Sequence, residues 1–383
     1  METQNINENK INIIKKIIPK LNLTYINFKI VNSNIEILIN LFIKIKKIYN
    51  ELPKDLEFQN DIIDKKFKKT IYHHVYNFIN NIDSQKLNKS KTLNKIFLLK
   101  HNNLYFFYLY KNHSDLEKDL NHIYYLAKIF FSMVKLFDIN QDSNQTRYVI
   151  WLPINSDRDY VHEKIDEQKL NTSVQDFKAF TVSGVTYSGG KLRITLITRF
   201  EEIEKLLIHE LIHNLHLDGS NYHDQNTNLI KEYNKTKQNQ NYNYEYSIYE
   251  SYTELLSTYL YLIFKNLNKS SKQIFKILLG QILIEIIYSY NTIVNLAKLN
   301  GYLDYNDFIN KQEFYGSICF YEYYYVKGLL YNNLILTFPK NFEEYKQLYN
   351  NIILIISTSH TDQLLEQMFK IYQKQKNFKY IFN

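Results

Sequence analysis

The residues with the clearest chemical potential are His209, Glu210 and His213, which form the pattern His-Glu-x-x-His. Apolar residues recur around them at helical spacing, so the pattern is predicted to lie within a helix. Residues four apart on a helix share one face, which lets two imidazoles converge on one Zn²⁺ while the adjacent glutamate reaches a water on the metal. We therefore predict that His209 and His213 bind zinc and that Glu210 is the catalytic base.

A catalytic zinc needs a third protein ligand and an open position for water. The favoured ligand is Glu250 in the next predicted helix, where Glu250 and Glu254 lie one turn apart on the same face. One carboxylate can bind the metal while the other accepts a proton from a ligand histidine and fixes its ring. Glu250 is predicted to be the ligand and Glu254 to support a ligand from outside the coordination sphere, with the reverse assignment as the alternative.

Three other side chains near the motif are weaker alternatives. His216 shares a face with His209 and His213, but a continuous helix places it about 10 Å along the axis from His209, so a supporting or exposed position is expected. Asp218 and His223 become possible ligands if the motif helix ends early.

The pairing of HExxH with ExxxE on a later helix resembles the gluzincins, the zinc peptidases typified by thermolysin. The likeness extends from Ile194 to Phe264. The segment Thr181–Thr186, with the strand and zinc helix that follow it, is also similar to uncharacterised metallopeptidases of large DNA viruses. The gluzincin resemblance implies zinc ligands at His209, His213 and Glu250, a catalytic base at Glu210, and Glu254 at the position where that family usually has Asp.

Two strands are expected to position the motif helix. Val185–Ser188 is bracketed by glycines, and Leu192–Ile197 alternates apolar and polar residues as a strand does. The motif helix then begins near Phe200 and ends near Gly219. The segment Leu192–Thr198 is predicted to be an exposed edge strand that pairs with an extended substrate.

The remaining elements are mainly helical. A polar loop at Asn221–Tyr244 is followed by apolar periodicity typical of helices. Two aromatic and β-branched runs, Phe97–Leu99 and Leu104–Tyr110, favour a hairpin in the N-terminal third, and a further strand is expected at Tyr148–Ile154. The predicted helices are Asn34–Leu52, Ser114–Phe137, Glu245–Phe264, Gln273–Leu299, Glu313–Leu336 and Phe342–Ser357.

These elements predict an α+β fold. It is mainly helical, with a small zincin-like antiparallel or mixed sheet packed on the HExxH helix and a helical lobe at the C-terminus. A polar stretch near residue 140 suggests two regions, a mainly helical one at 1–140 and a zincin-like catalytic one at 141–383. Within the second, the sheet and motif helix span 146–219 and the helical lobe spans 244–383.

Composition indicates the cellular compartment in which the protein is expected to act. The single cysteine, Cys319, excludes an intrachain disulfide and favours a reducing compartment. Charged residues interrupt the apolar residues of Met1–Leu23, so no signal peptide is predicted. The longest apolar segments, such as Ile277–Ile287 and Ile352–Ile356, are too short or too interrupted to supply the roughly 20 residues that span a bilayer. We expect a cytoplasmic protein without a membrane span, in a host cell or a virion.

The charge pattern argues against a nucleic-acid partner. The 47 basic and 39 acidic residues give a formal net charge of +8, and the lysines are spread along the predicted helices rather than clustered with an RNA-binding motif. The four arginines fall within residues 147–199, where a lysine-rich chain retains them for their planar fork. For Arg193 and Arg199 we expect ion pairs with Glu201 or Glu202, with contact to a substrate carboxylate as the alternative.

The predicted function is a zinc-dependent metallopeptidase that acts on a peptide or protein substrate. The oxyanion-stabilising donor is left open among His223, His360 and the tyrosines of Tyr315–Tyr325. The alternative is a catalytically inactive zincin-fold protein with a binding or virion-structural role. The intact Glu210 argues against that alternative, because a degenerate site does not need a base.

Overall fold

The computed structural model describes residues 12, 14–53, 57–58, 73, 95–137, 145–153, 184–189, 192–198, 202–219, 248–299, 302, 304–311, 325–358 and 362–373. The chain divides into two compact units, one formed by Phe42–Leu217 and the other by Met1–Leu41 together with Asp218–Asn383. The first division lies inside helix α2 (Phe28–Glu51) and the second follows the motif helix. These divisions differ from the one near residue 140 that the composition suggested.

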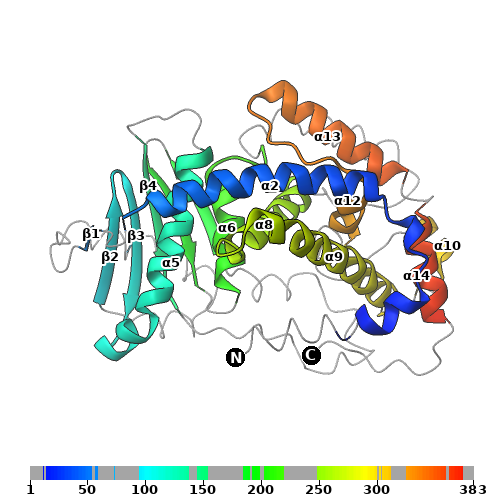
Figure 1. Cartoon of the computed structure of the whole chain (residues 1–383), viewed down its shortest axis with the longest axis horizontal. Coiled ribbons are helices and arrows are strands. Elements are labelled where there is room, and N and C mark those ends of the chain that lie inside the picture. The colour runs from blue at the N-terminus through cyan, green and yellow to red at the C-terminus, as the bar shows by residue number, and fades with distance from the viewer. Residues whose placement is uncertain are drawn as a thin grey trace. The chain divides into compact units, whose positions relative to one another are not determined.

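The unit of residues 42–217 is built on one mixed sheet of six described strands in the order β1-β2-β3-β4-β6-β5. Strands β1 to β4 of this sheet are labelled in Figure 1. Strands β3, β4 and β6 are parallel to one another, whereas β2 and β5 run antiparallel to their neighbours. A mixed sheet together with many helices confirms the α+β class. The strands are β1 (Glu57–Phe58), β2 (Lys95–His101), β3 (Leu104–Tyr110), β4 (Thr146–Trp151), β5 (Gly184–Gly189) and β6 (Leu192–Ile197).

The hairpin predicted in the N-terminal third is confirmed. Strands β2 and β3 pair in register from Lys95 opposite Tyr110 to His101 opposite Leu104. Their turn contains Asn102 with φ of 54°, a left-handed conformation that asparagine tolerates better than most residues.

The prediction that Leu192–Thr198 is an exposed edge is wrong. Strand β6 pairs with β4 on one side and with β5 on the other, so β5 is the edge of the described sheet. Both strands were expected from their residue pattern, but a period of two says nothing about which strand ends a sheet.

Two helices cover one face of this sheet. Helix α5 (His113–Phe137) packs on β2 and β3, and helix α6 (Ile203–Asn214) packs on β5, β6 and α5. On that face Trp151 lies 4.8 Å from the ring of Tyr108. The opposite face carries an apolar cluster of Leu98, Phe107, Leu109, Ile150, Leu152, Ile194 and Leu196. Because both faces are buried, the central strands are apolar on both sides.

The other unit is helical in its described residues. Helix α12 packs against α8, α9 and α13, and α14 packs against α9 and α10. The predicted helices at 245–264, 273–299 and 342–357 are confirmed within a few residues, whereas α14 was not predicted. The helices are α8 (Ile248–Lys265), α9 (Ser271–Leu299), α10 (Tyr305–Lys311), α12 (Lys327–Asn333), α13 (Phe342–Ser357) and α14 (Gln363–Gln373). The N-terminal segment of the same unit contributes two short 3₁₀ turns, η1 (Ile18–Lys20) and η2 (Leu23–Tyr25).

One predicted helix ends too late. The prediction Glu313–Leu336 covers α12, but the helix stops at Asn333 and the chain becomes extended, while residues 312–324 lie outside the described part. The buried side chain of Asn34 donates to the carbonyl of Leu334 at 2.9 Å and accepts from the amide of Leu336 at 2.7 Å. These two bonds give the backbone an alternative to helical pairing.

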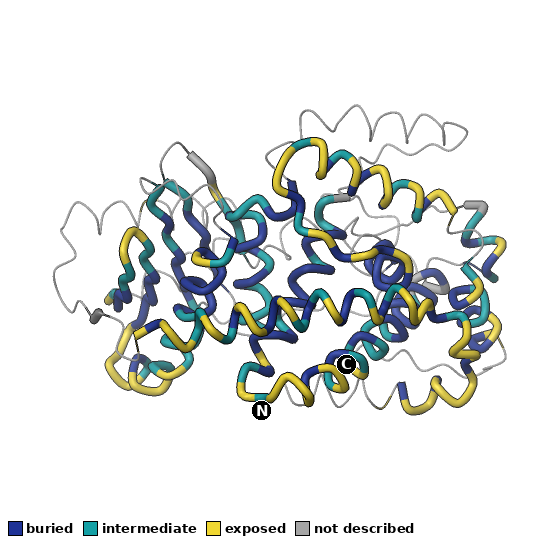
Figure 2. The backbone as a smooth tube through the Cα atoms, turned by 45° about the horizontal axis from the view of Figure 1, so that its top comes forward, coloured by how far each residue is buried: buried dark blue, intermediate teal, exposed yellow. Residues whose placement is uncertain are grey.

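Helices α13 and α9 differ in how their apolar residues are distributed and buried. Helix α13 is amphipathic, with Tyr345, Leu348 and Ile352 buried and an exposed outer side (Figure 2). Helix α9 is apolar along Ser271–Asn295, long enough by length and composition to cross a membrane, and 56% of its most apolar window is buried in the protein. A mostly buried core helix passes the same test, so this property is weak evidence for a membrane span.

Candidate metal centre

The motif helix α6 presents its two histidines from one face. Leu207, Ile208 and Leu211 are fully buried, whereas His209 and His213 are only partly buried. The helix ends at Asn214, and His216 follows in a left-handed conformation with φ of 55°. Packing therefore anchors the apolar side of α6 and leaves the imidazoles at the side that remains partly accessible.

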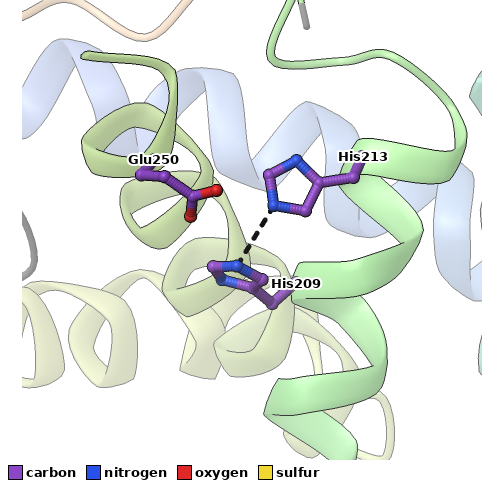
Figure 3. Close-up of side chains that lie close together, drawn as sticks. All are labelled: His209, His213 and Glu250. Carbon is purple, nitrogen blue, oxygen red and sulfur yellow. Dashed lines mark hydrogen bonds between the residues drawn. The ribbon is translucent and has the colours of Figure 1, made fainter. Parts of the chain in front are cut away.

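The two imidazoles converge as the spacing predicts. Their Nε2 atoms lie 3.3 Å apart and their ring centroids 5.0 Å apart (Figure 3). Two nitrogens bound at 2.0–2.1 Å to a tetrahedral zinc would be about 3.3 Å apart. The pair already has the separation that shared zinc coordination requires.

Glu250 lies in the first turn of α8, a helix fixed by the buried side chains of Tyr252, Leu255 and Leu256. The ligand atoms available on His209, His213 and Glu250 all lie within 4.8 Å of one another (Figure 3). Two imidazoles and one carboxylate are a donor set used by catalytic zinc sites. Among the described residues, this is the one such group of histidine, cysteine and acidic side chains.

Glu254 has different surroundings. Its Oε1 lies 3.4 Å from Nζ of Lys327, whose side chain is only 4% exposed, and its Oε2 accepts from the hydroxyl of Ser257 at 3.5 Å. Buried charges are stable only when they are paired, so Glu254 compensates the charge of Lys327. This contact gives Glu254 a role within the helical unit that the sequence did not reveal.

Glu210 is held against the edge strand β5. Its side chain is 7% exposed, and the hydroxyl of Thr186 lies 3.1 Å from Oε2 and 2.9 Å from the backbone carbonyl of the same residue. A Cβ built on Gly184 would lie 2.8 Å from both Cγ and Oε1 of Glu210. Thr186 thus binds the carboxylate, and Gly184 makes room for it.

We expect Gly184→Ala to displace the Glu210 carboxylate. The added methyl meets the middle of a side chain that is already bonded to Thr186, so Glu210 must leave that position or β5 must move. For the zinc peptidase that the sequence predicts, zinc content should be unchanged, and peptide hydrolysis should fall by about tenfold or more. Gly280→Ala is the matched control, because a Cβ there meets nothing within 4 Å. Equal activity in the two variants would contradict this account.

The structure gives no support to the weaker ligand alternatives, Asp218 and His216. Asp218 is buried and bonded through Oδ2 to the hydroxyl of Thr253 at 3.3 Å, and its carbonyl accepts from Tyr349. Neither Asp218 nor His216 belongs to the group of described side chains that could hold a metal ion. His223 lies outside the described residues, as do His360, Arg199 and the segment 315–324.

Arg193 has a partner that sequence reasoning missed. Its Nη1 donates to the carbonyl of Asn214, the last residue of α6, and Arg147 donates to the same carbonyl at 3.0 Å. Two cations at the C-terminus of a helix stabilise its partial negative charge. The retention of arginine in this stretch was a correct signal, but it did not indicate the acceptor.

Comparisons of the chain with family models, curated proteins and solved structures give no match.

Proposed function

We propose that this protein is a zinc-dependent metallopeptidase with a gluzincin-type site on a zincin-like fold. His209, His213 and Glu250 are the metal ligands, and Glu210 is the general base. The observation that carries the proposal is that one ligand atom from each of these three side chains lies within 4.8 Å of the others, next to a glutamate that the edge strand holds in place.

The chemistry follows from the residues present. Bound zinc would polarise a peptide carbonyl and make a water molecule more acidic. Glu210 accepts a proton from the attacking water and delivers it to the leaving nitrogen, so the peptide bond is cleaved without a covalent enzyme intermediate. Its carboxylate is suited to this task because Thr186 restricts its rotation on the side facing β5.

Glu250 is preferred over Glu254 as the third ligand. Glu250 offers an oxygen within the group of ligand atoms, whereas Glu254 contacts Lys327 and Ser257. Binding zinc through Glu254 would take the carboxylate away from a buried lysine and so weaken the compensation of a buried charge.

The substrate is proposed to be an extended peptide. Strand β5 is the edge of the described sheet, and it also carries Thr186 and Gly184 against Glu210. Edge strands bind peptides through their unpaired backbone groups. A peptide added to β5 would place a backbone carbonyl near the base, in place of the pairing with β6 that the sequence suggested.

Metal analysis together with a peptide assay tests the proposal. Purified protein should contain about one zinc per chain, should cleave members of a peptide library, and should lose activity on chelation and regain it when zinc is added. Protein that binds zinc without cleaving any peptide would support the inactive binding or virion-structural alternative. Protein that binds no zinc would overturn the metallopeptidase proposal.

A further inference from the structure

A buried chain of hydrogen bonds connects the end of the motif helix to the catalytic base. It passes from Arg147 to Asn214, Thr195, Thr186 and finally Glu210. Four elements take part, because Arg147 lies in β4, Asn214 ends α6, and the threonines face each other across β6 and β5. Its inner members are shielded from water, with Arg147 2%, Thr195 0% and Asn214 1% exposed.

Arg147 fixes which partner donates and which accepts along this series of hydrogen bonds. A guanidinium only donates, so the oxygen 2.6 Å from Nη1 of Arg147 must be the amide oxygen of Asn214. The Asn214 amide nitrogen is then the atom 3.1 Å from the hydroxyl of Thr195, and it donates to that oxygen. The orientation of an otherwise ambiguous amide is thereby settled by chemistry.

The same reasoning assigns the hydroxyl protons of Thr195 and Thr186. The Thr195 hydroxyl accepts from Asn214 and has one proton left, which points to the Thr186 oxygen 3.2 Å away. Thr186 then has its own proton to share between two acceptors on Glu210, since its Oγ1 lies 3.1 Å from Oε2 and 2.9 Å from the backbone carbonyl oxygen. The reverse order would leave an ionised carboxylate facing a hydroxyl oxygen with no proton between them.

We propose that Thr186 is a positioning residue for Glu210, and that the ordered chain from Arg147 keeps its hydroxyl turned toward the carboxylate. The inference rests on the proposed function, since Glu210 needs a fixed position only if it acts as a base. A threonine with no ordered neighbour could rotate its proton elsewhere. Here Thr195 donates to the Thr186 oxygen, so the Thr186 proton is directed to Glu210.

The first test measures the bond without any metal or substrate. Thermal unfolding midpoints are compared for metal-free wild type, Thr186→Val, Glu210→Met and the double variant. Thr186→Val should lower the midpoint by a few degrees in the wild-type background and by less than half of that in the Glu210→Met background. The cycle separates the carboxylate from the carbonyl of residue 210, which still accepts in both backgrounds. Equal shifts in the two backgrounds would overturn the proposal.

The second test separates positioning from general structure. In zinc-loaded protein Thr186→Val should lower kcat by about tenfold to a hundredfold with little change in KM, and Thr186→Ser should restore most of it. A change confined to KM, or a Ser variant as slow as Val, would overturn the positioning role. If Val prevents folding, Thr186→Ala is compared with Ser in the same assays.

The two tests distinguish the inference from the function on which it rests. Wild-type protein without peptidase activity would end the proposed function, while the unfolding cycle would still report whether Thr186 bonds to Glu210. Coupling without peptidase activity would leave a structural bond and would overturn the positioning role. Active protein in which the unfolding cycle shows no coupling between Thr186 and Glu210 would overturn only the role of Thr186.

Discussion

Replacing Glu210 with Gln is expected to abolish peptide hydrolysis while leaving zinc bound. The amide has nearly the shape of the carboxylate and can still accept from Thr186, but it cannot take a proton from water. General base catalysis contributes about 10²–10⁴-fold, so kcat should fall by at least about a hundredfold. Zinc content should match wild type, because the three proposed metal ligands are unchanged.

The matched control for Glu210→Gln is Glu204→Gln in the same helix. Glu204 lies in the first turn of α6 and contacts His122 at 3.1 Å, within a partly exposed pair. Exposed pairs contribute little to stability, so this variant should retain both zinc and activity. If Glu210→Gln cleaves peptides as fast as wild type, Glu210 is not the base and the mechanism fails.

Removing a ligand side chain is expected to have the second large effect. His213→Ala deletes one of the two imidazoles whose Nε2 atoms lie 3.3 Å apart, and a site with two remaining ligands should hold zinc at least about a hundredfold more weakly. Activity should be lost with the metal. His122→Ala removes an imidazole outside the group and should leave zinc content unchanged.

Measuring zinc affinity in variants of Glu250 and Glu254 decides which of the two is the third ligand. Glu250→Ala should weaken zinc binding strongly, whereas Glu254→Gln should leave zinc binding close to wild type. Gln is used at position 254 because its amide oxygen can still accept from Lys327, while Ala would leave that buried lysine without this partner and destabilise the fold by about 3–5 kcal/mol. Zinc affinity that falls with Glu254→Gln but not with Glu250→Ala would reverse the assignment.

Local patterns were informative wherever local physics dominates. The helical period around His209 and His213 predicted that two imidazoles would share a face, and the structure places their Nε2 atoms side by side. The β2–β3 hairpin was likewise predicted from two strand-like runs and a short turn, because the contacts involved are near in sequence.

Non-local contacts were not predictable in the same way. The end of α12 depends on Asn34, about three hundred positions earlier in the chain, and no period or capping residue near Leu334 indicates it. The contact of Lys327 with Glu254 is of the same kind, since the sequence predicted Glu254 to support a zinc ligand and gave no indication of Lys327. Gly184 stood out only as a turn glycine, yet its absent side chain makes room for Glu210.

By itself, the sequence determined which residues are chemically capable of binding zinc and of accepting a proton, because residue type and helical spacing decide that. Tertiary structure alone decided which strand is the edge, what holds Glu210, and which acceptor Arg147 and Arg193 share. The physical reason is that strand order and buried hydrogen bonds are settled by packing between segments far apart in the chain, whereas helical spacing is set within a single turn.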